Sequence, residues 1–86
     1  MKYEISLKDS AKKTLDNLTK KDRERIYKSF LAISHYPVYG NRLDLPVGDY
    51  YSIDIWPFMI IYKIFDKLKL VSIVKINYSL GVNKHW

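Results

Sequence analysis

The hydrophobic pattern of the first part of the chain predicts a short strand followed by a helix. Polar and apolar residues alternate from Lys2 to Ser6, which is typical of a strand at the edge of a sheet. Ser6 and Asp9 have the spacing of a helix-capping box, and apolar residues then recur at helical intervals. We therefore expect a helix from about Leu7 to Leu18.

A second helix is predicted to follow directly. Thr19 and Asp22 form another capping box, and an apolar stripe continues behind it through Ile26, Phe30 and Ile33. The helix should end before Pro37, because proline disfavours a helical conformation in the residue ahead of it. Two helices in direct succession form an antiparallel hairpin.

The second half of the chain changes from helical to strand periodicity. We expect a loop from Pro37 to Gly48, because this segment contains the glycine, proline and asparagine residues that turns select. Three segments rich in Ile, Val, Tyr and Phe follow, namely Tyr50–Ile55, Phe58–Phe65 and Leu70–Ile76. Trp56-Pro57 and Asp66-Lys67 separate them, which predicts an antiparallel meander, and residues 79–86 are expected to be a tail.

These elements predict one α+β domain over residues 1–86, with the order β-α-α-β-β-β. Strand alternation divides the middle strand of the meander into two faces. The side expected to join the core carries Phe58, Ile60, Tyr62 and Ile64, whereas Met59, Ile61 and Lys63 face the other way.

Composition narrows the classes of function. The chain of 86 residues has no cysteine, which excludes disulfides and thiolate metal sites. Its longest apolar stretch, Ile55 to Ile61, contains Pro57 and is too short to span a bilayer, so we expect a cytoplasmic protein with no membrane partner. Fifteen Lys and Arg against nine Asp and Glu give a net charge of +6, which favours an anionic partner such as nucleic acid or an acidic protein segment. A basic surface that serves solubility alone is the alternative.

No phosphate loop, dinucleotide glycine fingerprint, zinc-ligand spacing or serine elbow occurs, so we expect neither a cofactor nor a metal. Of the two histidines, His35 is expected at the end of the second helix. His85 lies beside Lys84 and Trp86, where an imidazole, a cation and an aromatic plane would meet a nucleotide; a frayed terminus is the alternative.

Four further cations stand outside the predicted helices. Arg42 lies in the predicted loop, Lys63 and Lys75 lie on predicted strands, and Lys84 lies in the tail. Strands and the loops between them can present cations on one concave surface. A cluster of this kind would hold a phosphate.

Taken in order, several segments resemble the RelE/ParE family of bacterial and archaeal toxins. They are Tyr3-Glu-Ile5, the basic helical hairpin, Arg42-Leu43, Gly48 to Ile55, and Phe58 to Ile64. The most specific piece is a Gly-x-Tyr strand followed by a strand that ends in Ile60-Ile61-Tyr62. The resemblance spans nearly the whole chain and implies a helical hairpin packed over a small antiparallel sheet.

The resemblance also implies a function. It points to the toxin of a type II toxin–antitoxin pair, which an antitoxin neutralises by wrapping a segment around it. RelE-like members cleave messenger RNA on the ribosome, which makes the ribosome and mRNA the expected partners. ParE-like members instead poison DNA gyrase without nuclease activity, and a catalytically degenerate toxin is a further alternative.

The chain departs from the family where catalysis resides. The family commonly has a Gly-Asp-Tyr-Arg turn, whereas this chain has a methionine, Met59, at the position of that arginine. An arginine on the preceding strand aligns with Asp54, and the usual His-Arg pair near the end of the last strand aligns with Asn77-Tyr78.

Cleavage of RNA by its own 2′-hydroxyl requires proton removal, charge neutralisation at phosphorus and protonation of the leaving oxygen. The residues that would take these roles here fall into three groups. We expect Arg42, Lys63 and Lys75 to supply charge, His85 and Tyr78 to transfer protons, and Tyr51, Lys84 and Trp86 to bind RNA.

Overall fold

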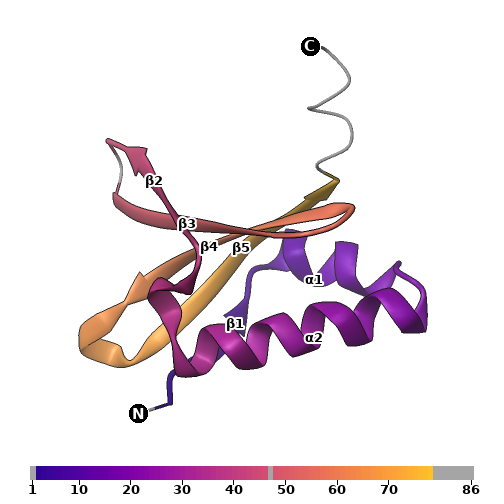
Figure 1. The fold of residues 1–86 in the computed structure, drawn as a ribbon, viewed down its shortest axis with the longest axis horizontal. Coiled ribbons are helices and arrows are strands. Elements are labelled where there is room, and N and C mark those ends of the chain that lie inside the picture. Colours follow the sequence, from indigo (N-terminus) through magenta and orange to yellow (C-terminus); the bar gives the residue numbers. More distant parts are fainter. Residues whose placement is uncertain (1, 47, 79–86) are drawn as a thin grey trace.

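The computed structural model describes residues 2–46 and 48–78, which form a helical layer packed against one side of a five-stranded sheet (Figure 1). The helices are α1 (Asp9–Asp16) and α2 (Lys20–His35). The strands are β1 (Glu4–Leu7), β2 (Asn41–Leu45), β3 (Gly48–Ile55), β4 (Phe58–Phe65) and β5 (Leu70–Tyr78). Two single-turn 3₁₀ helices, Pro37–Tyr39 and Asp66–Leu68, lie between them.

The strand order is β1-β5-β4-β3-β2, so β1 lies at one edge of the sheet, as expected. The predicted α+β fold is confirmed. The sheet is mixed, because β1 pairs in parallel with β5 whereas all other neighbours are antiparallel. Neither helix of the described residues has the length and apolar character that crossing a bilayer would require.

The segment predicted as a single loop contains an additional strand. Its first part is the 3₁₀ helix at Pro37, but Asn41–Leu45 forms β2 along the free edge of β3. The sequence of β2 is Asn-Arg-Leu-Asp-Leu, which has no β-branched or aromatic residue and is flanked by Gly40 and Pro46. It becomes a strand because β3 supplies hydrogen-bonding partners, a contact that local propensity does not reveal.

The two predicted capping boxes have different outcomes. The Thr19 side chain accepts a hydrogen bond from the Asp22 backbone N–H at 3.2 Å, so the second helix begins as predicted, and it ends at His35, ahead of Pro37. The box at Ser6 is wrong. Ser6 belongs to β1, where it pairs with β5, and α1 begins only at Asp9, with no side-chain cap. Pairing with β5 keeps Ser6 in an extended conformation, outside the helix.

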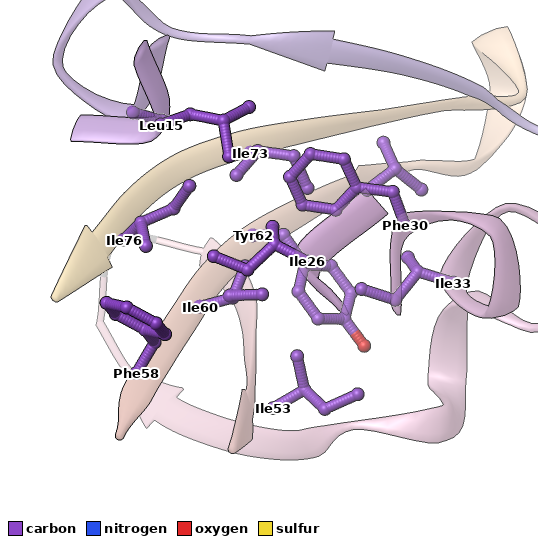
Figure 2. Close-up of a cluster of buried hydrophobic side chains, with 12 residues drawn as sticks. Leu15, Ile26, Phe30, Ile33, Ile53, Phe58, Ile60, Tyr62, Ile73 and Ile76 are labelled. Atoms are coloured by element: carbon purple, nitrogen blue, oxygen red, sulfur yellow. The ribbon is translucent and has the colours of Figure 1, made fainter. Parts of the chain in front are cut away.

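The core lies between the helices and the inner face of the sheet (Figure 2). The alternation predicted for β4 is confirmed, since Phe58, Ile60 and Tyr62 are buried and Ile64 is half-buried. The other buried apolar residues are Ala11, Leu15, Ile26, Phe30, Ile33, Ile53, Val71, Ile73 and Ile76. Burying one such large side chain contributes about 1.5–3 kcal/mol, so this cluster is the main source of stability.

Tyr62 carries the one phenol in this cluster, and its hydroxyl joins the core to the chain leading into β2 (Figure 2). The hydroxyl donates to the Pro37 carbonyl oxygen at 2.7 Å and accepts from the Gly40 N–H at 3.0 Å. Burial raises the pKa of Tyr62, partly offset by the hydrogen bond from Gly40. A Cβ at Gly40 would lie 2.5 Å from both the Tyr62 hydroxyl and the Ser52 carbonyl oxygen, so this close approach requires glycine.

Candidate functional site

The face of the sheet that points away from the helices, called the open face below, collects the polar residues of the three central strands. Residues that pair in register point to the same side of a sheet. The open face therefore comprises Tyr50, Ser52 and Asp54 of β3, Met59, Ile61, Lys63 and Phe65 of β4, and Leu70, Ser72, Lys75 and Asn77 of β5. Two lysines of the predicted cation cluster lie here.

Lys63 is held in a defined position by aromatic rings. Its ammonium nitrogen lies 5.3 Å from the ring centroid of Tyr50 and 5.1 Å from that of Phe65, within the range of cation–π attraction. It also lies close to Gly48, where a Cβ would be 3.2 Å from the nitrogen. Gly48 has φ of 140°, a conformation that side chains rarely adopt. The Lys63 ammonium therefore lies over the start of β3, next to Gly48 and the rings of Tyr50 and Phe65.

Lys75 reaches the open face because β5 contains a bulge. Ile61 pairs with Lys75, but the next residue of β4, Tyr62, pairs with Ile73, so Val74 is left over between the two pairs. Without this extra residue Lys75 would share the inward side of Ile73. The bulge turns Lys75 outward and lets Ile76 enter the core, where it is 3% exposed.

Neither Lys63 nor Lys75 forms an ion pair with another described residue. They come from adjacent strands on one face, with Lys63 half-buried and Lys75 exposed. Two unpaired cations on a sheet surface with aromatic neighbours can hold a phosphate group and stack a base.

The three departures from the family sequence form one row across the open face. Asp54 pairs with Met59, and Met59 pairs with Asn77 on the next strand. A carboxylate, a thioether and an amide thus occupy the row where the resemblance implies two arginines and a histidine. The two lysines of the open face lie further along the strands than this row. Lys75 pairs with Ile61, and Lys63 lies two residues beyond Ile61 on β4.

The remaining described candidates lie on the opposite side of the sheet. Arg42 pairs in register with Tyr51 and forms an exposed ion pair with Asp49 at 2.9 Å. The Tyr51 ring stacks on Tyr62, with ring centroids 5.7 Å apart. The structure therefore does not bring Arg42 and Tyr51 together with the two open-face lysines.

Tyr78 is the last residue of β5 and is 57% exposed, and its ring lies 4.9 Å from that of Phe58. It pairs with Phe58, so it points to the helix side at the end of the sheet. Lys84, His85 and Trp86 lie outside the described residues.

The described open face supplies charge but no imidazole. On the three central strands its ionisable groups are Lys63, Lys75, Asp54 and Tyr50, and the one histidine among the described residues, His35, ends α2. Within residues 2–46 and 48–78 no three His, Cys, Asp or Glu side chains gather in a way that could hold a metal ion.

The sequence alone did not predict that Tyr50 and Gly48 position Lys63. A signal was present, because Gly48 and Tyr50 are two residues apart on a strand and so share a side. The pairing of Tyr50 with Lys63 could not be predicted from the sequence, because it depends on the register between β3 and β4.

No protein-family model and no curated protein matches the chain. Solved structures do. The RelE–RelB complex of Pyrococcus horikoshii matches with a TM-score of 0.80 and 21% identity, covering 91% of this chain and 96% of that one. The Escherichia coli RelBE toxin–antitoxin complex gives 0.78 and 20%, with 88% and 95% covered.

The RelBE2 toxin–antitoxin complex of Mycobacterium tuberculosis also matches, with a TM-score of 0.80, 19% identity, and 91% of this chain and 99% of that one covered. The chain therefore has the fold of the RelE structures over nearly its whole length. This confirms the fold that the sequence resemblance implies.

Proposed function

We propose that this chain, which has the RelE fold, is the toxin of a type II toxin–antitoxin pair and acts as a ribosome-dependent endoribonuclease on mRNA. The observation that carries the proposal is the agreement between the sequence signature and the full-length structural match, with TM-scores of 0.78–0.80 to three toxin–antitoxin complexes. The net charge of +6 suits an RNA target in the cytoplasm.

In this proposal Lys63 and Lys75 hold the RNA phosphate on the open face. Both cations lack a carboxylate partner among the described residues, so a phosphate does not have to displace one. The aromatic rings around Lys63 limit its motion, which lowers the entropic cost of binding. Arg42, Tyr51 and Tyr78 lie on the other side of the sheet and would contact RNA beyond this phosphate. His85 would carry the proton, and Lys84 and Trp86 would add RNA contacts.

The test is cell-free translation with the purified protein, with messenger RNA cleavage read by primer extension. We expect cuts only when ribosomes are present. Lys63→Gln and Lys75→Gln should each reduce cleavage roughly 10- to 100-fold, as loss of a charge-stabilising group does. Lys67→Gln is the matched control, because Lys67 is an exposed lysine of the 3₁₀ turn after β4. Equal cleavage by all three variants would refute the phosphate site.

His85→Ala and Arg42→Ala test the other assigned roles. Loss of growth arrest in His85→Ala, with an unchanged circular dichroism spectrum, is expected if His85 transfers the proton. Because Arg42 pairs with Asp49, Asp49→Ala is measured beside Arg42→Ala. A role for the Arg42 charge predicts that only the arginine variant loses toxicity, whereas equal effects indicate that the ion pair matters for stability.

A non-catalytic toxin of the ParE kind, or a degenerate one, is the second candidate. The specific observation in its favour is the cross-sheet row of Asp54, Met59 and Asn77, which presents a carboxylate where RNA cleavage needs cations. A gyrase supercoiling assay on the same preparation separates the two. Intact mRNA with blocked supercoiling would establish the ParE-like alternative and contradict the nuclease proposal.

The partner under this proposal is a cognate antitoxin protein. Co-expression with the product of a neighbouring short reading frame should relieve growth arrest and yield a stable complex on gel filtration. Growth arrest that no neighbouring gene product relieves would contradict the pairing.

A further inference from the structure

The row of Asp54, Met59 and Asn77 across the open face places two hydrogen-bonding side chains around an apolar centre. Asp54 pairs with Met59 on the next strand, and Met59 pairs with Asn77 on the strand beyond. Asp54 is exposed, whereas Met59 and Asn77 are half-buried. Neighbouring strands lie about 4.8 Å apart, so Asp54 and Asn77 lie about 10 Å apart on either side of Met59. A flat base has room between them.

The chemistry of this row suits a base and not a phosphate. No hydrogen bond or ion pair joins the side chain of Asp54 or Asn77 to another described residue. An ionised carboxylate only accepts hydrogen bonds, and an amide both donates and accepts them. Both groups recognise the polar edges of bases. The thioether of Met59 between them makes favourable contacts with aromatic rings.

A cation that can hold the phosphate of the same nucleotide lies one row away. Lys75 pairs with Ile61, which is two residues beyond Met59 on β4. Two residues of a strand span about 6.7 Å, which is comparable with the distance from the phosphate of a nucleotide to its base. Lys75 is exposed and forms no ion pair with Asp54 or any other described residue. One nucleotide can thus place its phosphate on Lys75 and its base over Met59.

We infer that Asp54 and Asn77 recognise the base of the RNA nucleotide whose phosphate lies on Lys75, and that Asp54 selects against uracil. Guanine, adenine and cytosine each carry an amino group that donates to a carboxylate, whereas uracil flanks its single N–H with two carbonyl oxygens that a carboxylate repels. Guanine presents two adjacent donors, which fit both carboxylate oxygens, and its carbonyl oxygen can accept from the Asn77 amide. That RNA occupies the open face rests on the proposed function.

The test is fluorescence anisotropy with the full chain and fluorescein-labelled 2′-O-methyl hexanucleotides, which lack the 2′-hydroxyl that cleavage needs. Five positions are uridine, and the third is guanosine, adenosine, cytidine or uridine. We expect the guanosine oligonucleotide to bind tightest. The all-uridine oligonucleotide should bind at least about fivefold more weakly, as the loss of one bidentate contact to a base predicts.

Asp54→Asn keeps the shape of the side chain and removes its charge, so it should bring the two dissociation constants within about twofold of each other. The ratio is the readout, because removing any negative charge strengthens the binding of every oligonucleotide. Asp44→Asn is the matched control and should leave the ratio unchanged. Asp44 is exposed and lies on the same side of β2 as Arg42, away from the open face. Asn77→Ala should weaken binding of the guanosine oligonucleotide.

Four results would overturn the inference: no saturable binding up to millimolar protein, equal affinity for all four oligonucleotides, the same ratio in Asp54→Asn as in Asp44→Asn, or unchanged guanosine binding in Asn77→Ala. Binding is measured without ribosomes and without cleavage. Intact mRNA in the translation assay would therefore refute the nuclease and leave the base preference standing, whereas ribosome-dependent cuts with equal affinity for the four bases would refute base recognition alone.

Discussion

Replacing Tyr62 with phenylalanine tests whether the buried hydroxyl holds the start of β2 against the core. The substitution removes one oxygen and leaves the ring in place, so apolar packing against Ile60 and Ile73 is retained. What it removes is the donor to the Pro37 carbonyl oxygen and the acceptor of the Gly40 N–H, at 2.7 and 3.0 Å. Both backbone groups then lose their partner.

The expected destabilisation follows from these two bonds. Each hydrogen bond contributes about 0.5–1.5 kcal/mol net, and a buried group left without a partner costs about 1–3 kcal/mol. Pro37 is buried and Gly40 is half-buried, so water replaces the lost partners only in part. We expect Tyr62→Phe to lower the free energy of unfolding by about 2–3 kcal/mol. For a domain of this size that corresponds to a melting temperature roughly 10–20 °C lower.

The assay is urea unfolding followed by circular dichroism, with Tyr51→Phe as the control. Tyr51 stacks directly on Tyr62, but its hydroxyl has no hydrogen bond with any described residue. The control should therefore stay within about 0.5 kcal/mol of the wild type. A Tyr62→Phe effect no larger than that of Tyr51→Phe, at an unchanged denaturant slope, would refute the reasoning.

Three further predictions concern stability. Thr19→Ala removes the cap that accepts from the Asp22 N–H and should cost about 1 kcal/mol in urea unfolding, and Thr19→Ser should restore most of it. The pKa of Tyr62 is raised, so the contribution of its neutral hydroxyl to the free energy of unfolding is complete below pH 10 and is lost as pH rises through the folded-state pKa. Tyr62→Phe should therefore lose less stability than the wild type as pH rises above 10 in urea unfolding. An equal loss in both proteins would contradict this. The hydrogen bond from Tyr3 lowers the pKa of Asp66, so its contribution is present above the usual value of 3.8 and fades as pH falls; Tyr3→Phe should flatten this acid dependence, and an unchanged acid profile would contradict it.

Local sequence was sufficient for the elements whose signals are local. The cap at Thr19 depends on residues three positions apart, and the end of α2 depends on Pro37, which acts on the residue before it. The inward side of β4 could be read from alternation, because Phe58, Ile60 and Tyr62 lie on one regular strand. The RelE-like order of elements followed from these signals and from the Gly-x-Tyr and Ile-Ile-Tyr segments.

Pairing with distant strands decided the rest. Ser6 has the spacing of a helix cap, yet it lies in β1 because β5 pairs with it, and β2 forms only because β3 offers its edge. The candidate site depends on the same kind of contact. Simple alternation places Lys75 on the side of Ile73, but the bulge at Val74 reverses it, so that Lys75 joins Lys63 on the open face. A strand's own sequence fixes which residues share a side only while its pairing is regular, and the position of a bulge is set by the partner strand.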